Sequence, residues 1–106
     1  MQTTIQDRVM GWTKDLVSAL EKNYTDRYPE SPNDITFSIT TGKKYIKVVQ
    51  DNGGVHAFVN KNTGEVYKPA GWKAPAKHVR YDMRIINQRE RMLTMCDWAG
   101  GYLYMR

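Results

Sequence analysis

The sequence has few of the residues that build disulfides, metal sites or membrane spans. It contains one cysteine, Cys96, and two histidines, His56 and His78, among 106 residues. One cysteine cannot close an intrachain disulfide, and neither histidine has a further ligand at the spacing of a zinc site. No run approaches 18 apolar residues, and the first residues lack the basic and apolar segments of a secretory signal. We therefore expect a soluble cytosolic domain that folds without a metal, cofactor or disulfide.

Candidate catalytic residues are also scarce. His56 lies within an apolar run, which is typical of a structural histidine, and His78 has cationic neighbours that favour a neutral ring. Cys96 has apolar neighbours and is expected to be a buried, inert thiol, with a catalytic nucleophile as the less favoured alternative. The run at 42–44, Gly-Lys-Lys, lacks the upstream glycine of a nucleotide-binding loop. The sequence thus favours a binding protein over an enzyme.

Positive charge is concentrated in the middle of the chain. The formal net charge is +5, and residues 1–34 contribute −2 because they carry four basic and six acidic side chains. Residues 35–81 carry eight basic and two acidic side chains, a balance of +6, and residues 82–106 contribute +1. A localised basic segment attracts polyanions by electrostatic steering and by release of counterions from phosphates. The alternative is a soluble surface that is simply rich in lysine.

The first part of the chain has the pattern of an amphipathic helix. Thr4 and Asp7 suit the start of this helix, as an N-cap residue and an acid in the first turn. Gly11 is unfavourable inside a helix, so we expect it to allow close approach to another element. Apolar residues recur every three or four positions, at Ile5, Val9, Trp12, Leu16, either Ala19 or Leu20, and Tyr24. A loop with two prolines follows at residues 28–34.

The next part is predicted to form strands. Residues 35–40 alternate apolar and hydroxyl side chains, as a half-buried strand does. Three further short strands are predicted at residues 45–49, 55–59 and 65–68, separated by turns that contain glycine. Connections this short cannot join parallel strands, so the strands should form an antiparallel four-stranded meander.

Residues 69–77 hold two prolines and a glycine, which predict a loop, and residues 89–98 are predicted to form a second helix. Asn87 and Glu90 suit a capping box at its start, and Gly100–Gly101 suits its end, before a strand-like aromatic tail. The fold class expected is α+β, a single domain over residues 1–106. Its parts are an N-terminal helix (1–28), a sheet (35–68), a basic loop with proline and tryptophan (69–81), and a C-terminal helix with tail (82–106).

Cations and aromatic residues are interleaved along the predicted sheet and the loop after it. Alternation along residues 44–49 places Tyr45, Lys47 and Val49 on one face and Lys44, Ile46 and Val48 on the other. The second set is more aliphatic and should face the helices, so Tyr45 and Lys47 should point to solvent. The alternative is that the aromatic residues, Trp72 above all, cover the core while lysines extend around them. The candidate site comprises Lys43, Lys44, Tyr45, Lys47, Tyr67, Lys68, Trp72, Lys73, Lys77 and Arg80.

Two segments resemble a family of small uncharacterised proteins encoded by tailed bacteriophages. They are VHAFVNKNTGEVYKPAGWKAPAK at residues 55–77 and DWAGGYLY at residues 97–104, about a third of the chain. The resemblance implies a phage gene product that acts in the cytoplasm of an infected bacterial host. It brings no catalytic residues.

The leading hypothesis is a basic, non-sequence-specific nucleic-acid-binding protein, with single-stranded DNA or RNA as its partner. Single-stranded nucleic acid needs cations along its phosphates and aromatic faces for its bases, and the candidate site has both. The first alternative is an interaction protein that binds and modulates a host protein such as a polymerase, a nuclease or a ribosomal component. The second is a minor component of the virion.

Overall fold

The computed structural model describes residues 4–30, 35–51 and 53–104. The predicted loop at 28–34 and the end of the predicted tail lie partly outside these residues. In chain order the elements are α1 (Ile5–Arg27), β1 (Phe37–Thr41), β2 (Tyr45–Gln50), β3 (Val55–Asn60), β4 (Glu65–Tyr67), β5 (Tyr81–Asp82), α2 (Ile86–Met95) and the 3-10 helix η1 (Gly101–Tyr104). The α+β class is confirmed.

Within the described residues the sheet has five antiparallel strands in the order β1-β2-β3-β4-β5, so the predicted count of four was wrong. The additional strand, β5, pairs Tyr81 with Val66 and Asp82 with Glu65 of β4. Two residues are too short to show an alternating pattern, and β5 exists only because β4 offers it a pairing edge. The chain between β4 and β5 is therefore tied to the sheet at both ends.

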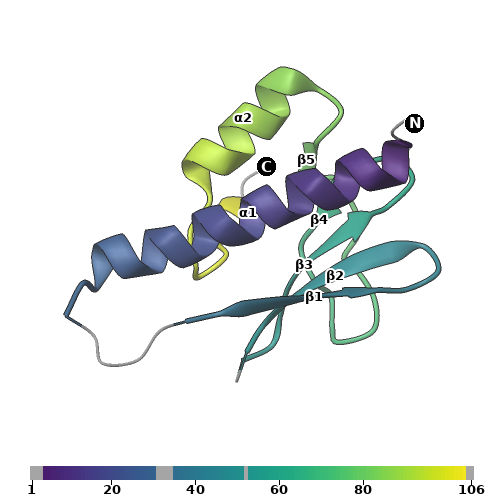
Figure 1. Cartoon of the computed structure of the whole chain (residues 1–106). Coiled ribbons are helices and arrows are strands. Elements are labelled where there is room, and N and C mark those ends of the chain that lie inside the picture. The colour runs from purple at the N-terminus through teal and green to yellow at the C-terminus, as the bar shows by residue number, and fades with distance from the viewer. Residues whose placement is uncertain (1–3, 31–34, 52, 105–106) are drawn as a thin grey trace.

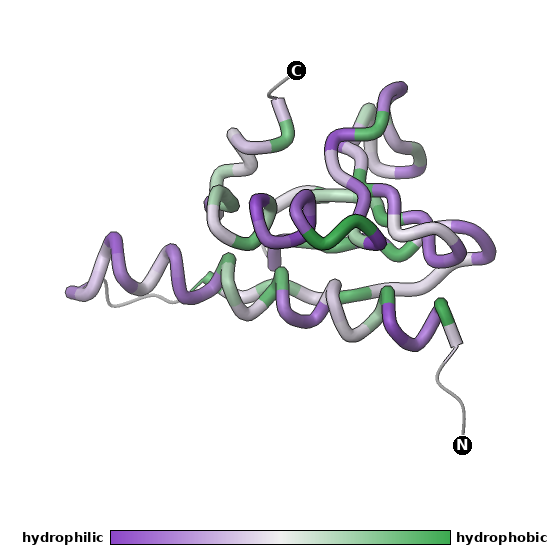
Figure 2. The backbone as a smooth tube through the Cα atoms, turned by 90° about the horizontal axis from the view of Figure 1, so that it is seen from above, coloured by the Kyte–Doolittle hydropathy of each residue, from purple (hydrophilic) through white to green (hydrophobic). Residues whose placement is uncertain are grey.

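Helix α1 begins with the predicted N-cap, Thr4, which forms a capping box with Asp7. The Asp7 amide donates to Thr4 Oγ1 at 3.1 Å, and the Asp7 carboxylate accepts from the Thr4 amide at 3.4 Å. Val9, Leu16 and Leu20 are fully buried, as the stripe predicts. Figure 2 shows hydrophobic and hydrophilic positions alternating along this helix.

The expected role of Gly11 was wrong, because a Cβ built on it meets nothing within 4 Å. Close approach occurs instead at Gly64, in the turn between β3 and β4. Its φ is +79°, and an added Cβ would lie 3.3 Å from Met83 Cβ and 3.5 Å from Val9 Cγ2. This turn is therefore where the sheet meets the first turns of α1 and the segment after β5.

The C-terminal part departs most from the prediction. Helix α2 spans 86–95 rather than 89–98, and its N-cap, Ile85, makes no side-chain hydrogen bond, so the expected Asn87–Glu90 capping box is absent there. The helix ends because Cys96 has extended backbone angles, and Gly100–Gly101 does not cap it. The described part of the aromatic tail is a 3-10 helix and not a strand. Its residues Tyr102 and Leu103 are buried in the core.

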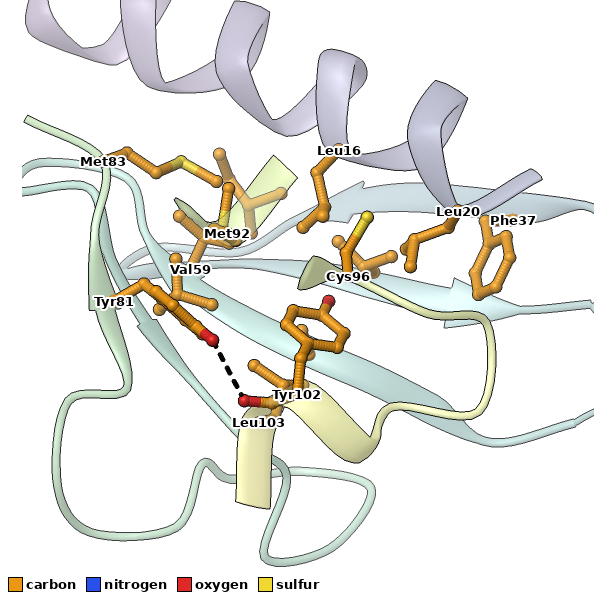
Figure 3. Packing of buried hydrophobic residues seen from close by; sticks show 14 of the residues in the cluster. Leu16, Leu20, Phe37, Val59, Tyr81, Met83, Met92, Cys96, Tyr102 and Leu103 are labelled. Carbon is orange, nitrogen blue, oxygen red and sulfur yellow. Dashed lines mark hydrogen bonds between the residues drawn. The ribbon is translucent and has the colours of Figure 1, made fainter. Parts of the chain in front are cut away.

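Both helices lie on one side of the sheet, and the loop between β4 and β5 lies on the other (Figure 1). The core fills the space between the helices and the sheet. Leu16 and Leu20 of α1 point toward it, together with Met92 and Tyr102 (Figure 3). The hydroxyl of Tyr81 donates to the Tyr102 carbonyl at 3.2 Å, which links β5 to η1. Among the described residues, no helix is both long enough and apolar enough to cross a membrane.

Candidate functional site

Cross-strand pairing builds a row of side chains on the sheet face away from the helices. Thr40 pairs with Lys47, Lys47 with Phe58, and Phe58 with Tyr67, across four neighbouring strands. Directly paired residues share a face, so these four side chains stand side by side. The neighbouring pair, Ile46 and Val59, is buried on the helix side, as strand alternation predicts for Ile46.

Aromatic rings form the floor of this face. Phe58 is buried, and the Tyr45 ring meets it edge-on with 5.9 Å between centroids. Tyr45 also meets Tyr67 edge-on at 6.0 Å. Lys47 Nζ lies 5.8 Å from the Phe58 centroid, so a cation stands over the apolar floor. Burial, and then the neighbouring Glu65 carboxylate, raise the pKa of Tyr67 above its usual range.

Trp72 extends from the loop between β4 and β5 and is 57% exposed. The loop folds back on itself: Pro69 bridges to Pro75, and the Ala76 amide donates to the Lys68 carbonyl at 2.8 Å. Lys47 Nζ lies 4.5 Å from the centroid of the Trp72 ring, a cation–π contact. The alternative role of Trp72 as a cover for the core does not fit an indole with more than half of its surface in solvent.

A cleft of about 390 Å³ lies beside this aromatic floor, at the turn between β1 and β2. Four lysines line it, and its lining contains no acidic residue among those the structure describes. Lys61 Nζ donates to the Gly42 carbonyl at 2.8 Å, and the Gly42 amide donates to the Tyr45 carbonyl at the same distance, so the turn is held in place. Four cations without a counter-charge make the cleft electropositive. Its lining residues are Thr40, Thr41, Gly42, Lys43, Lys44, Tyr45, Lys47, Phe58 and Lys73.

The structure thus brings five of the ten predicted site residues into one cleft: Lys43, Lys44, Tyr45, Lys47 and Lys73. Tyr67 and Trp72 adjoin it through their contacts with Tyr45 and Lys47. The other three, Lys68, Lys77 and Arg80, do not line it.

Lys68 lies over the ring of Tyr104, 4.5 Å from its centroid. The Arg80 amide donates to the Val66 carbonyl at 2.7 Å, which places Arg80 beside β4. Lys77 is exposed in the loop.

His56 and Cys96 are both buried and neither lines the lysine cleft. Both have structural surroundings. His56 Nε2 and the Tyr102 hydroxyl are hydrogen-bonded at 2.7 Å, and burial lowers the pKa of His56 to about 4. Burial raises the pKa of Cys96 to about 11, so its thiol stays protonated at neutral pH. Within the described residues, no three His, Cys, Asp or Glu side chains gather as a metal site requires.

Sequence reasoning missed Phe58 and Tyr104. Phe58 lies in a run of apolar residues, 55–59, interrupted only by His56. An apolar run without alternation indicates a strand covered on both faces, so this signal could have shown that an apolar side chain of this strand covers the outer face. The pairing with Lys47 identifies that residue as Phe58. Tyr104 had no such signal, because its contact with Lys68 joins segments far apart in the sequence.

The sequence matches the Family of unknown function (DUF7717) over residues 1–105. The chain belongs to this family. The match spans both helices, the sheet and the loop, so the cleft lies wholly within the family's domain. No curated protein and no solved structure matches the chain.

Proposed function

We propose that this family member binds single-stranded nucleic acid without sequence specificity. The observation that carries the proposal is the cleft with four lysines and no acidic residue in its described lining, next to the exposed ring of Trp72. Lysines neutralise phosphates, and aromatic faces stack on unpaired bases for about 1–3 kcal/mol each. Lysine and aromatic side chains lie next to each other here, because Lys47 contacts both Phe58 and Trp72.

The chemistry of the lining favours binding without base readout. Lysine ammonium groups act as point charges, whereas base identity is read mainly by the paired donors and acceptors of Arg, Asn or Gln. The described lining of the cleft contains none of these three residue types. The proposed partner is therefore defined by its backbone charge and its unpaired bases, which both DNA and RNA supply.

The proposed setting is the cytoplasm of an infected bacterium. The resemblance of residues 55–77 and 97–104 to a phage-encoded family supports this setting. A small basic protein there would meet single strands during replication and transcription.

Binding to a host protein is the alternative function, and the exposed apolar residues of α2 bear on it. Ile86 is 59% exposed and Met95 is 47% exposed. Nine helical positions separate them, which places them on opposite sides of the helix. They do not form one apolar patch, so the lysine-rich cleft remains the better-supported interface.

The test is a fluorescence titration with single-stranded oligonucleotides of DNA and of RNA at low salt. Because Trp72 is exposed, stacking on a base should quench its emission, and Trp72→Ala should remove that change. Trp72→Ala should weaken binding by about 1–3 kcal/mol. The slope of log affinity against log salt should stay the same, since stacking releases no counterions.

Trp72→Phe is the matched control, because it keeps an aromatic face and should retain part of the lost affinity. A duplex of the same length should bind more weakly, since its bases are already paired. The proposal fails if neither DNA nor RNA strands bind at low salt. It also fails if Trp72→Ala lowers the melting temperature and leaves the fluorescence change intact.

A further inference from the structure

A lysine lies over a second exposed aromatic ring, as Lys47 lies over the ring of Trp72. Tyr104 of η1 is 61% exposed, and Lys68 Nζ lies 4.5 Å from its ring centroid. The distance from Lys47 Nζ to the Trp72 centroid is also 4.5 Å. The two pairs come from different parts of the chain, yet each offers an accessible ring beside a cation.

Two further hollows connect the Trp72 ring with the Tyr104 ring. One, of about 340 Å³, is lined by Trp72, and the other, of about 110 Å³, is lined by Tyr104. Gly54, Val55 and Pro69 belong to the lining of both, so the hollows are contiguous. Neither lining contains an acidic residue among those described, as in the lysine cleft. Lys47 of the cleft contacts Trp72 of the first hollow, and Lys68 contacts Tyr104 of the second. A path with a lysine beside each exposed ring thus leads from the cleft past Trp72 to Tyr104.

The length of this path follows from strand β3. Phe58 lines the lysine cleft, and Gly54, just before β3, lines both hollows at the other end. Four residues of a strand rise on the order of 13 Å. A stacked nucleic-acid strand advances about 3.4 Å per nucleotide, so the stretch of the path along β3 accommodates roughly four nucleotides.

We propose that Tyr104 and Lys68 form a second stacking position at the far end of this path. The ligand is then a strand of about four or more nucleotides, held by Trp72 and Tyr104 at separate points, and not a mononucleotide or dinucleotide. This inference rests on the proposed function, because it extends the same surface to a second contact with the same strand.

The experiment compares oligothymidylates of two and eight nucleotides against the full-length protein and the variants Tyr104→Ala and Tyr104→Phe. The dinucleotide should bind at the lysine cleft, where positive charge is densest, so Tyr104→Ala should leave its affinity unchanged. The same substitution should lower affinity for the eight-nucleotide strand by roughly five- to 150-fold. Tyr104→Phe should restore most of that affinity, because it keeps the ring.

The melting temperatures of Tyr104→Ala and Tyr104→Phe check that neither substitution destabilises the fold. Equal affinity of Tyr104→Ala and wild type for the long strand, with Trp72→Ala still weakening it, would overturn the second position and leave the proposed function standing. If Tyr104→Ala lowered the affinity for the two- and eight-nucleotide strands equally, the second position would also be overturned. The effect of the substitution would then not depend on the length of the strand. Absence of binding by either length at low salt would overturn both proposals together.

Discussion

His56 is an ionisable side chain that the fold holds in its neutral form. It is buried at the junction of β3 and η1, where it is hydrogen-bonded to Tyr102 and meets the Phe37 ring edge-on. Burial lowers the pKa of His56 from 6.5 to about 4, against the opposing effect of the Asp97 carboxylate. The unfolded chain therefore takes up a proton at a higher pH than the folded chain does.

This difference predicts a pH-dependent stability. Above pH 6.5 both states are neutral at His56, and its contribution is fully present. As the pH falls from 6.5 toward 4, only the unfolded state gains the proton, so the free energy of unfolding decreases. Between pH 7 and pH 5 the loss should be about 2 kcal/mol. Urea unfolding at the two pH values measures it, with His56→Gln as the variant whose stability should change less.

The carboxylates with shifted pKa values do not contribute to the change in stability between pH 7 and pH 5. The pKa values of Asp51 and Asp82 are lowered by hydrogen bonds, to Ser38 and Arg84 respectively, so both carboxylates stay ionised at pH 5. NMR titration of the imidazole supplies a direct check on the folded protein. A His56 that titrates near pH 6.5 in the folded state would contradict the prediction.

The candidate site could be predicted in part from single residues. Charge and strand alternation are local properties, so the sequence predicts the basic segment and the solvent-facing positions of Tyr45 and Lys47. It assigns Lys44 to the helix-facing set, whereas Lys44 lies just before β2 and lines the cleft. The contact of Trp72 with Lys47 depends on how the thirteen-residue loop at 68–80 folds back over the sheet, which no local pattern records. The pairing of Lys68 with Tyr104 depends on the 3-10 helix of the tail in the same way.

At the scale of elements, replacing each of two glycines by alanine should have opposite effects on the stability of the protein. Gly11 lies inside α1 and is exposed, and a Cβ there meets nothing. Gly11→Ala should therefore stabilise the protein by about 0.5–1 kcal/mol, because alanine loses less backbone entropy on forming a helix. Gly64→Ala should destabilise it by more than about 1 kcal/mol, because the turn has a positive φ and the Cβ would crowd Met83. Urea unfolding of both variants tests the pair, and destabilisation by Gly11→Ala would contradict it.

The elements differ in how far the sequence predicts them. Helix α1 has a capping box and a long apolar stripe, so its start and its buried face follow from local rules. Helix α2 begins after Ile85, which provides no side-chain cap, and its start is set by contacts: Gln88 accepts from the Asp82 amide, and Arg89 donates to the Met83 carbonyl. Strand β5 exists through pairing alone. Elements that form through tertiary contacts carry little local signal.

At the scale of the whole molecule, the lysines of the cleft lie on the side of the sheet opposite the helices. Helix α1, on one side of the sheet, carries four basic and four acidic side chains, while the cleft on the other side has four lysines and no acidic residue in its described lining. A polyanion that approaches the protein is therefore drawn to the open face of the sheet and not to the helical face.

This asymmetry predicts that the position of a charge matters more than the net charge. Reversal of Lys43, Lys44 and Lys47 to Glu should remove retention on a heparin or phosphate matrix at moderate salt. Reversal of Arg8, Lys14 and Lys22, three exposed residues of α1, changes the net charge equally and should retain most of the binding. Elution salt and the salt slope of oligonucleotide binding measure both variants. Equal loss in the two would mean that no localised site exists.

The ammonium group that rests on Trp72 has a consequence for selectivity. A flat molecule that settles on the ring face covered by Lys47 must first displace that cation, at a cost on the order of 0.5–1 kcal/mol. A neutral aromatic compound gives the displaced ammonium nothing in exchange. A nucleotide delivers its own phosphate to the freed lysine, so the displacement is compensated within the same encounter. If the ring stacks on bases as proposed, the occupied ring should therefore favour nucleotides over uncharged aromatic compounds.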